Sequence, residues 1–190
     1  YYSLKVVTQM CFKNDLRIFD IKTNNINGGS VQIFICKKEA KYKNNSTSVQ
    51  RFLTLEANLK LNKKEKYIKF FKKINKIKKK VLYLIKKAKS KNKSVHCYGA
   101  STKGNVLLQY FKLNNKLIDC VAERNPKKYG LYTPGSKIKI ISEIDSRKLS
   151  PDYYLVLPWH FKKEILRRER ETIKHGSKFI FPLPKLTVNN

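Results

Sequence analysis

The sequence predicts an α/β protein whose C-terminal half is built on a parallel sheet. From Ser94 onward, short apolar segments typical of strands alternate with segments of helical periodicity. The first of these strands runs into a glycine-containing turn and then a helix, in the stretch "HCYGASTKGNVLLQYF" at residues 96–111. With 41% apolar residues, the chain can form a real core. Strands and helices that alternate in this way indicate a Rossmann-like sheet, in which ligands bind at the carboxyl ends of the strands.

Residues 1–38 predict one helix followed by a β-hairpin. The stretch "SLKVVTQMCFKNDL" has helical spacing, "LRIFDIK" and "SVQIFICKK" alternate like strands, and Asn27-Gly28-Gly29 marks the turn region between them. Two strands and one helix cannot bury a core alone. The chain also begins without a methionine. We therefore expect a C-terminal fragment, in which residues 1–38 complete an incomplete domain that lies mostly upstream.

Residues 39–93 predict a linker and a long basic helix. The polar stretch "EAKYKNNSTSVQ" at 39–50 is typical of a linker, and residues 51–90 indicate a helical connector. Residues 60–93 hold sixteen lysines and a single acid, Glu65. Apolar residues recur there at steps of three and four, which predicts an amphipathic helix that packs on a neighbouring domain and leaves its lysines solvated. An anionic membrane or another polyanion is the alternative partner for such a helix. The apolar positions are Tyr67, Phe70, Phe71, Ile74, Ile77, Val81, Leu84, Ile85 and Ala88.

Residues 94–190 are long enough for a small independent domain. We expect a strand at "SVHCY", a helix over 103–112, and further strands at "LIDCVAE", "KIKII" and "DYYLVLP". A helix over 161–174 and a final strand at "KFIFPLP" complete the pattern.

The net charge of +30, from 43 Lys and Arg against 13 Asp and Glu, suggests a nucleic-acid partner. Only seven of these cations are arginines, however, and the lysines accompany abundant Asn, Ile, Tyr and Phe and few glycines. Codons rich in A and T give that composition, and the reading of base edges favours the forked guanidinium of arginine. We therefore expect no specific nucleic-acid partner.

The sequence also lacks the signals of a membrane span, a signal peptide and a cysteine framework. No run approaches the roughly 18 apolar residues of a membrane helix, and no leader resembles a signal peptide. We expect a soluble, cytoplasmic protein without a membrane span. The four cysteines (Cys11, Cys36, Cys97 and Cys120) form no C-x-x-C pair, so we expect small hydrophobic residues rather than a metal site or disulfides.

The turn from Gly99 to Asn105 is a candidate phosphate site, because a helix that begins after a strand favours an anion at its N-terminus. It is not a P-loop, since Asn105-Val106 stands where Lys and Ser or Thr would follow the second glycine. It also lacks the middle glycine of a dinucleotide fingerprint, which Ser101 replaces. Glu123 ends the next strand, about where a ribose-binding acid would lie. The alternative is that these glycines serve the turn sterically.

Four stretches carry a resemblance to a known family: "GASTKGNVLLQYF", "VAERNPKKYGLYTPGSKIKIIS", "PDYYLVLPWHFKKEILRRE" and "GSKFIFPLP". In this order they resemble the C-terminal domain of SAM-dependent C-methyltransferases that act on nucleotide-linked deoxysugars. The stretch "YYSLKVV" and the predicted hairpin are similar to the closing helix and hairpin of that family's SAM-binding domain. The resemblance covers nearly the whole chain.

The resemblance implies that this chain is the substrate half of such an enzyme. In the family, the SAM-binding glycine loop, a zinc-binding domain and a Tyr-His-Glu-His segment with the acid/base chemistry all lie upstream of the position matched by residue 1. The family removes a proton beside a sugar keto group and transfers the SAM methyl group to that carbon. We therefore expect no catalytic residue in this chain and no activity of the chain alone.

The candidate substrate-binding residues follow from the matched motifs and the chemistry of their side chains. Arg124 and Lys128 are expected to contact further phosphate or ribose groups, and Tyr132, Trp159 and His160 the base or the sugar. Trp159 has a core role as its alternative, and His160 a role as a cap or surface residue. For the diphosphate we expect Gly99, Ser101, Lys103, Gly104 and Asn105.

Two other function classes remain open. An NAD-type oxidoreductase module is disfavoured by the missing middle glycine and by the lack of an obvious hydride-transfer constellation. A basic nucleic-acid or membrane adaptor rests on charge that the composition already explains.

Overall fold

A computed structural model describes residues 2–189 of the chain, which divide into two compact units between residues 72 and 73. The first unit contains α1 (Leu4–Phe12), β1 (Leu16–Asn24), a 3₁₀ turn at Ile26–Gly28, β2 (Ser30–Lys37) and α2 (Ser46–Asn58). Strands β1 and β2 pair antiparallel, so the expected helix and hairpin are both present. That they complete a larger domain stays a prediction.

The expected linker at 39–50 is shorter than predicted, because α2 already begins at Ser46. The segment before it is also held in place. Arg17 on β1 donates hydrogen bonds to the backbone oxygens of Ala40 and Tyr42. Asp20 accepts hydrogen bonds from the side chains of Asn45 and Ser48. Sequence polarity alone did not reveal these contacts, because they join residues more than twenty positions apart.

Helix α2 is also fixed to α1 by one carboxylate. Glu56 accepts hydrogen bonds from the backbone N–H groups of Leu4 and Lys5, at 2.6 and 3.2 Å. These N–H groups belong to the first turn of α1, where no intrahelical acceptor exists and where a negative charge is favoured.

Helix α3 (Lys64–Lys89) is the predicted lysine-rich helix, and its residues from 73 onward belong to the second unit. The apolar stripe of this part packs into the core of that unit through Ile77, Val81, Ile85 and Ala88. In the first part, Tyr67, Phe70 and Phe71 are more than half exposed, and its packing on a neighbouring domain stays a prediction. The amphipathic pattern therefore extends further along the sequence than its burial within the unit does.

The second unit is an α/β domain around one six-stranded sheet. Its strands are β3 (Val95–Tyr98), β4 (Val121–Glu123), β5 (Ile140–Ser142), β6 (Tyr153–Val156), β7 (Lys178–Phe181) and β8 (Thr187–Asn189), in the order β5-β4-β3-β6-β7-β8. All neighbouring pairs are parallel except β7 and β8. The predicted Rossmann-like parallel sheet is confirmed, with an antiparallel strand added at one edge.

Three details differ from the prediction. The segment "KFIFPLP" is not the last strand, because β8 follows it and pairs with β7. The helix expected over 161–174 is divided at Glu169 into α6 (Lys162–Arg168) and α7 (Arg170–Lys174). A short helix, α5 (Glu143–Lys148), precedes β6 and was not predicted. Each of these elements is too short to give a clear periodic signal.

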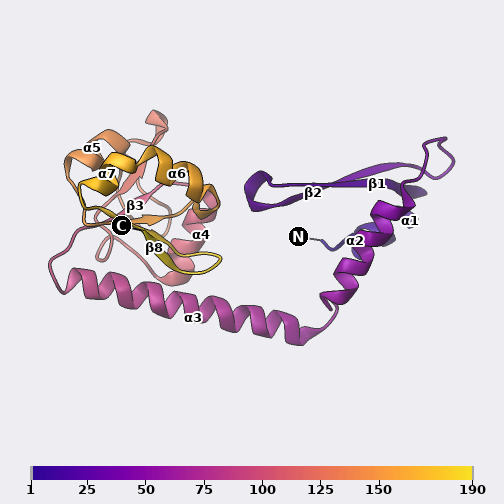
Figure 1. Ribbon diagram of the computed structural model, residues 1–190, viewed down its shortest axis with the longest axis horizontal. Helices are drawn as coiled ribbons and strands as arrows, with labels where there is room; N and C mark the ends of the chain where they lie inside the picture. Colours follow the sequence, from indigo (N-terminus) through magenta and orange to yellow (C-terminus); the bar gives the residue numbers. More distant parts are fainter. Residues whose placement is uncertain (1, 190) are drawn as a thin grey trace. The chain divides into compact units, whose positions relative to one another are not determined.

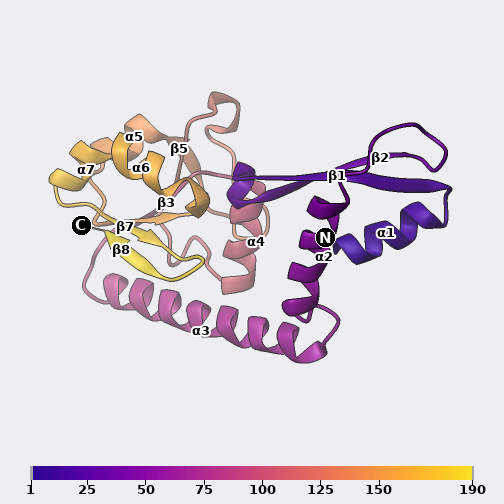
Figure 2. The same ribbon diagram turned by 45° about the vertical axis from the view of Figure 1, so that its right-hand side comes forward.

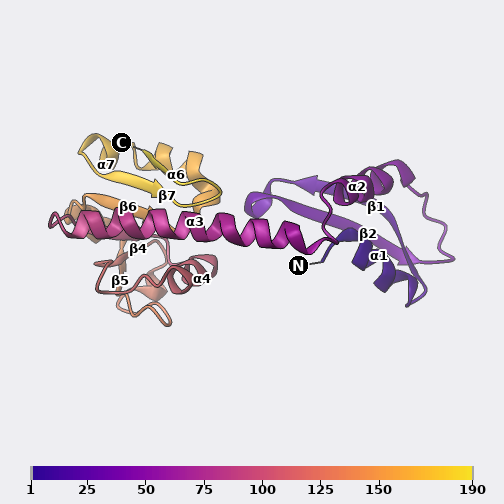
Figure 3. The same cartoon turned by 90° about the horizontal axis from the view of Figure 1, so that it is seen from below.

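Helices cover both faces of the sheet (Figures 1 and 2). Helices α3 and α4 (Thr102–Phe111) pack on one face, and Figure 3 shows α3 running across it. Helices α6 and α7 pack on the other face through Ile165 and Ile173. Strand β3 alternates accordingly, since Cys97 lies in the first core and Tyr98 in the second.

Two expectations from composition can be checked within residues 2–189. All four cysteines are free, and Cys11, Cys97 and Cys120 are buried. Within this part of the chain, no helix combines the length and the apolar character that crossing a membrane requires.

We predict that Gly104→Ala destabilises the second unit. Alanine in a helix interior normally adds up to about 1 kcal/mol relative to glycine. Here the added Cβ would lie 2.7 Å from the Cβ of Leu157, and such overpacking costs about 1–3 kcal/mol. We expect a lower free energy of unfolding in urea, followed by the fluorescence of Trp159, the only tryptophan.

Val106→Ala is the matched control, because Val106 lies on the same helix and its side chain is exposed. It should change stability by less than about 0.5 kcal/mol. A Gly104→Ala protein as stable as the wild type would show that α4 does not need this close approach to Leu157.

Candidate functional site

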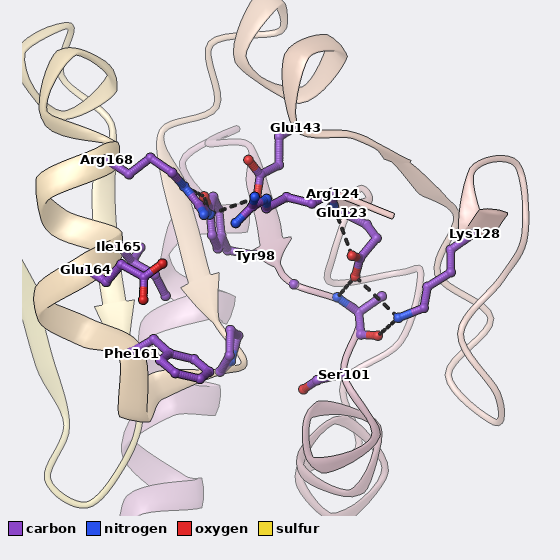
Figure 4. A pocket seen from close by; sticks show the side chains of 13 residues that line it. Tyr98, Ser101, Glu123, Arg124, Lys128, Glu143, Phe161, Glu164, Ile165 and Arg168 are labelled. Atoms are coloured by element: carbon purple, nitrogen blue, oxygen red, sulfur yellow. Dashed lines mark hydrogen bonds and ion pairs between the residues drawn. The ribbon is translucent and has the colours of Figure 1, made fainter. Parts of the chain in front are cut away.

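The candidate site is a cavity of about 380 Å³ at the carboxyl ends of the parallel strands. Tyr98, Glu123 and Glu143 line it at the ends of β3, β4 and β5, and Pro158 lines it beyond β6 (Figure 4). The chain places β4 and β5 on one side of β3 and then returns to place β6 on the other side. Ligands of open α/β sheets bind at such a reversal of strand order.

The turn between β3 and α4 opens on this cavity. Gly99 has a φ of +83°, and a Cβ there would lie 2.9 Å from Cδ of Pro158. Ser101 caps α4, because its Oγ accepts a hydrogen bond from the N–H of Gly104 at 3.0 Å. The hydroxyl proton of Ser101 stays available for a ligand, and the N–H of Thr102 has no intrahelical acceptor. The predicted strand, glycine turn and helix N-terminus are therefore all present.

Glu123 fastens this turn to the loop that follows β4. Its Oε2 accepts a hydrogen bond from the N–H of Ala100 at 2.7 Å. Its Oε1 accepts from the N–H groups of Arg124 and Asn125 at 2.9 and 3.0 Å. Burial alone would raise the pKa of Glu123, but these backbone hydrogen bonds and the charge of Lys128 lower it overall. The carboxylate is therefore an ionised cross-link between two loops.

Lys128 closes the same cross-link from the other side. Its ammonium group donates a hydrogen bond to the backbone oxygen of Ala100 at 2.8 Å and lies 3.6 Å from the Glu123 carboxylate. Lys128 thus lines the cavity with a charge that already has protein partners.

The opposite wall contains a buried ion network. Glu169, only 1% exposed, accepts hydrogen bonds from the Tyr98 hydroxyl at 2.7 Å and from Arg147 at 2.6 and 2.9 Å. Glu143 accepts from Arg147 and Arg168, each at 3.0 Å. Burial would raise the pKa of Glu169, but the hydrogen bonds from Arg147 and Tyr98 lower it overall. This wall is therefore ionised and internally paired.

Two charged groups of the cavity lack such partners. Within residues 2–189, the guanidinium of Arg124 and the carboxylate of Glu164 make no hydrogen bond or ion pair. Arg124 follows β4, and Glu164 lies in the first turn of α6. Phe161 lines the cavity beside Glu164 (Figure 4).

Comparison with known proteins identifies the family of the chain. Residues 25–184 match the family described as "C-methyltransferase C-terminal domain". This chain belongs to the C-methyltransferase C-terminal domain family. It is also 29% identical over 188 residues to "C-methyltransferase NovU" of Streptomyces niveus. That match covers 99% of the chain and 44% of the relative, so the chain spans less than half the length of this curated relative. The resemblance to C-methyltransferases is confirmed.

In this C-methyltransferase domain, the structure brings together four of the predicted site residues. Gly99, Ser101, Arg124 and Lys128 all line the cavity. Gly104 does not line it; it lies beneath the turn, against Leu157 of the core. Their binding of a ligand stays a prediction.

The predicted residues on α4 beyond the turn do not line the cavity. Lys103 is exposed in the first turn of α4. Partial burial, and then the nearby charge of Lys103, lower the pKa of His160. The Oδ1 atom of Asn105 is buried and accepts no hydrogen bond from residues 2–189.

The three aromatic candidates also lie outside the cavity lining. Tyr132 is 62% exposed on the excursion between β4 and β5, where it forms a bridge with Lys139. Trp159 is half-buried and packs against both cores. His160 is adjacent in the same 3₁₀ turn, Trp159–Phe161, and only Phe161 of that turn faces the cavity.

Sequence reasoning missed Phe161, Glu164, Glu143 and Arg168 as lining residues. A signal existed for the first two. They lie three residues apart at the start of α6, with Phe161 as its N-cap, and this helix follows a strand that ends at the ligand-binding edge. Glu143 and Arg168 form an ion pair with each other across 25 residues, which no local spacing indicates.

We predict that Glu169→Gln lowers stability at neutral pH by about 1–3 kcal/mol, because it removes charge-assisted hydrogen bonds from a buried network. A lowered pKa in the folded state means that Glu169 stabilises the fold above the ordinary glutamate pKa of about 4.3. This stabilisation is lost as the pH falls through the lowered value. The difference between wild type and variant should therefore shrink on acidification below about pH 4.

Urea unfolding followed by Trp159 fluorescence at several pH values measures this difference. Glu171→Gln serves as the control, because Glu171 is exposed and forms an ion pair with Lys174 at the surface. A wild-type and Glu169→Gln difference that is the same at pH 7 and pH 3.5 would contradict the assignment of an ionised Glu169.

Proposed function

We propose that this chain binds the diphosphate of a nucleotide-linked deoxysugar, and that it supplies the substrate-binding part of a SAM-dependent C-methyltransferase. One observation carries the proposal. The cavity places a helix N-terminus beside Arg124, whose guanidinium has no partner among residues 2–189, in a chain of the C-methyltransferase C-terminal domain family. The name of the relative, a C-methyltransferase, supports the reaction class.

The geometry suits a diphosphate for three physical reasons. The N-terminus of α4 offers backbone N–H groups and the positive end of its dipole. The Ser101 hydroxyl can donate to a phosphate oxygen. The guanidinium of Arg124 can form a forked, charge-assisted contact with phosphate, and Lys103 adds positive charge at the same turn of α4.

The cavity differs from a dinucleotide site, in which a middle glycine lets the backbone approach the pyrophosphate and an acid at the end of the second strand accepts hydrogen bonds from ribose. Ser101 replaces that glycine. Glu123 occupies the acidic position, but its oxygens already accept three backbone N–H groups. We therefore derive no methyl-transfer step in this cavity, and an NAD-type oxidoreductase is not favoured. SAM and zinc, which the family resemblance assigned to an upstream region, stay predictions.

The basic character of the chain does not favour a nucleic-acid adaptor. The lysines of α3 surround a helix whose apolar residues Ile77, Val81 and Ile85 pack in the core. Packing therefore explains this part of the helix without a polyanion partner.

Arg124→Ala should weaken binding of thymidine diphosphate glucose by about ten- to a hundredfold, the loss of a charge-assisted contact. Lys103→Ala should weaken it in the same direction. Calorimetric titration measures the affinity, and thermal melts should be unchanged because both side chains are exposed.

Lys127→Ala is the matched control, because Lys127 is exposed and does not line the cavity. Its affinity should stay within about threefold of the wild type. Equal affinities of wild type and Arg124→Ala, or no binding of the nucleotide sugar by a folded wild type, would refute the proposal.

We also expect that the chain alone does not bind SAM, because residues 1–38 supply a helix and a hairpin without a SAM-binding glycine loop or a candidate base. Titration with SAM under the conditions used for the nucleotide sugar tests this. Micromolar affinity for SAM would place the cofactor within this chain.

A further inference from the structure

A second, smaller cavity of the second unit is lined by residues of α3 and of the loop between β7 and β8. Its volume is about 210 Å³. Its apolar lining residues are Ile77, Pro184 and Leu186. Ile77 belongs to the core, and Leu186 packs against that core. Because close-packed side chains support this apolar surface, the cavity keeps its shape without a ligand.

Every charged residue that lines this cavity, among those that the structure describes, is a lysine: Lys73, Lys76, Lys80 and Lys185. The ammonium groups of these four lysines make no ion pair or hydrogen bond within residues 2–189. Other lysines of α3 do have partners. Lys78 lies 4.8 Å from the centre of the Tyr110 ring, and Lys89 pairs with Asp119 at 2.6 Å. The protein therefore leaves the charges of the small cavity without partners.

The arrangement of these lysines is unfavourable by itself. Lys73, Lys76 and Lys80 follow one another at steps of three and four along α3, so they lie on one face of the helix and repel each other. Lys185 adds a fourth positive charge from a different segment of the chain. A ligand with negative charges would relieve this repulsion.

The apolar residues and the size of the cavity narrow the class of anion. Sites for whole small molecules usually measure about 300–1,000 Å³, so a cavity of about 210 Å³ suits a single apolar side chain better. Protein interfaces commonly place one apolar side chain in such a pocket and surround it with polar groups. The complementary partner therefore carries an apolar side chain with acidic residues beside it.

We propose that this cavity docks an acidic segment of a partner protein. The segment inserts one leucine or phenylalanine side chain against Ile77, Pro184 and Leu186, and its carboxylates pair with the surrounding lysines. A second copy of this chain is a poor partner, because its net charge of +30 is repulsive. The docking site goes beyond the proposed function, since it shares no lining residue with the cavity at the carboxyl ends of the strands.

Calorimetric titration of the whole chain with short synthetic peptides tests the proposal. The probe is a peptide with blocked ends in which one leucine lies between two pairs of glutamates. At physiological salt it should bind about tenfold or more tightly than the same peptide with serine in place of leucine, as expected for burial of a leucine side chain. A peptide with glutamine in place of every glutamate should not bind, because it cannot pair with the lysines.

Two double variants with the same net charge separate the cavity from the general charge of the chain. Lys76→Gln with Lys80→Gln should weaken binding of the leucine peptide about five- to tenfold, through the loss of two exposed ion pairs. Lys72→Gln with Lys79→Gln is the matched control, because both lysines are exposed on α3 outside the cavity lining. The control should stay within about twofold of the wild type. Thermal melts should be unchanged in both, since all four positions are exposed.

Leu186→Ser tests the apolar contact and should remove the preference for the leucine peptide over the serine peptide. Leu186 packs against the core, so a thermal melt must accompany this variant. The peptide series on the wild type tests the same contact without any substitution.

Three results would overturn the docking site. The first is equal affinity of the wild type for the leucine and serine peptides. The second is an equal loss of affinity in the two double variants, which would show that net charge alone attracts the peptide. The third is a single-stranded oligonucleotide that loses as much affinity as the leucine peptide when Lys76 and Lys80 are replaced, and none in the control. That result would make the cavity a contact for nucleic acid.

Discussion

The carboxylate of Glu123 holds together the two loops between which the candidate site opens. It accepts three backbone N–H groups from the loops after β3 and β4, and Lys128 adds a cation on the same side. A half-buried carboxylate is stable as an anion only with such partners. Because Glu123 binds the backbone N–H of Arg124, it fixes the chain at this position while the guanidinium stays available. This one interaction thus shapes the side of the cavity that we propose for phosphate and engages the acid at the end of β4.

On the opposite wall of the cavity, buried carboxylates are also held by hydrogen-bonded partners, and here all the partners are side chains. Glu169 and Glu143 pair with Arg147 and Arg168, and the Tyr98 hydroxyl joins them at the end of β3. A network of this kind tolerates burial because each charge has hydrogen-bonded partners. As a consequence, few charged groups that line the cavity stay without a protein partner, and these few are the ones that a ligand can bind.

The lysines and the arginines of the chain lie in different places. Lysines dominate the sequence and cover α3, yet Arg124, Arg147 and Arg168 supply the cavity and its wall from only seven arginines in the chain. The planar guanidinium of arginine can form two parallel hydrogen bonds with a carboxylate or a phosphate. The ammonium group of lysine, on its flexible chain, lacks this geometry. The large net charge is therefore a poor guide to the site.

The sequence by itself determined the alternation of strands and helices, the turn from Gly99 to Gly104 and the helix that begins there, because each depends on near neighbours in the chain. It also carried the family, through long motifs whose order and separation are specific. It did not reveal strand β8 or the division of the last helix at Glu169, which depend on pairing and on a buried carboxylate. Only the tertiary structure decided which predicted residues reach the cavity. It packs the half-buried Trp159 against both cores, leaves Tyr132 at the surface, and brings Phe161 and Glu164 to the ligand-binding edge. The physical reason is that a site at the ends of parallel strands is assembled from loops far apart in sequence, and their side chains are oriented by contacts that no local pattern records.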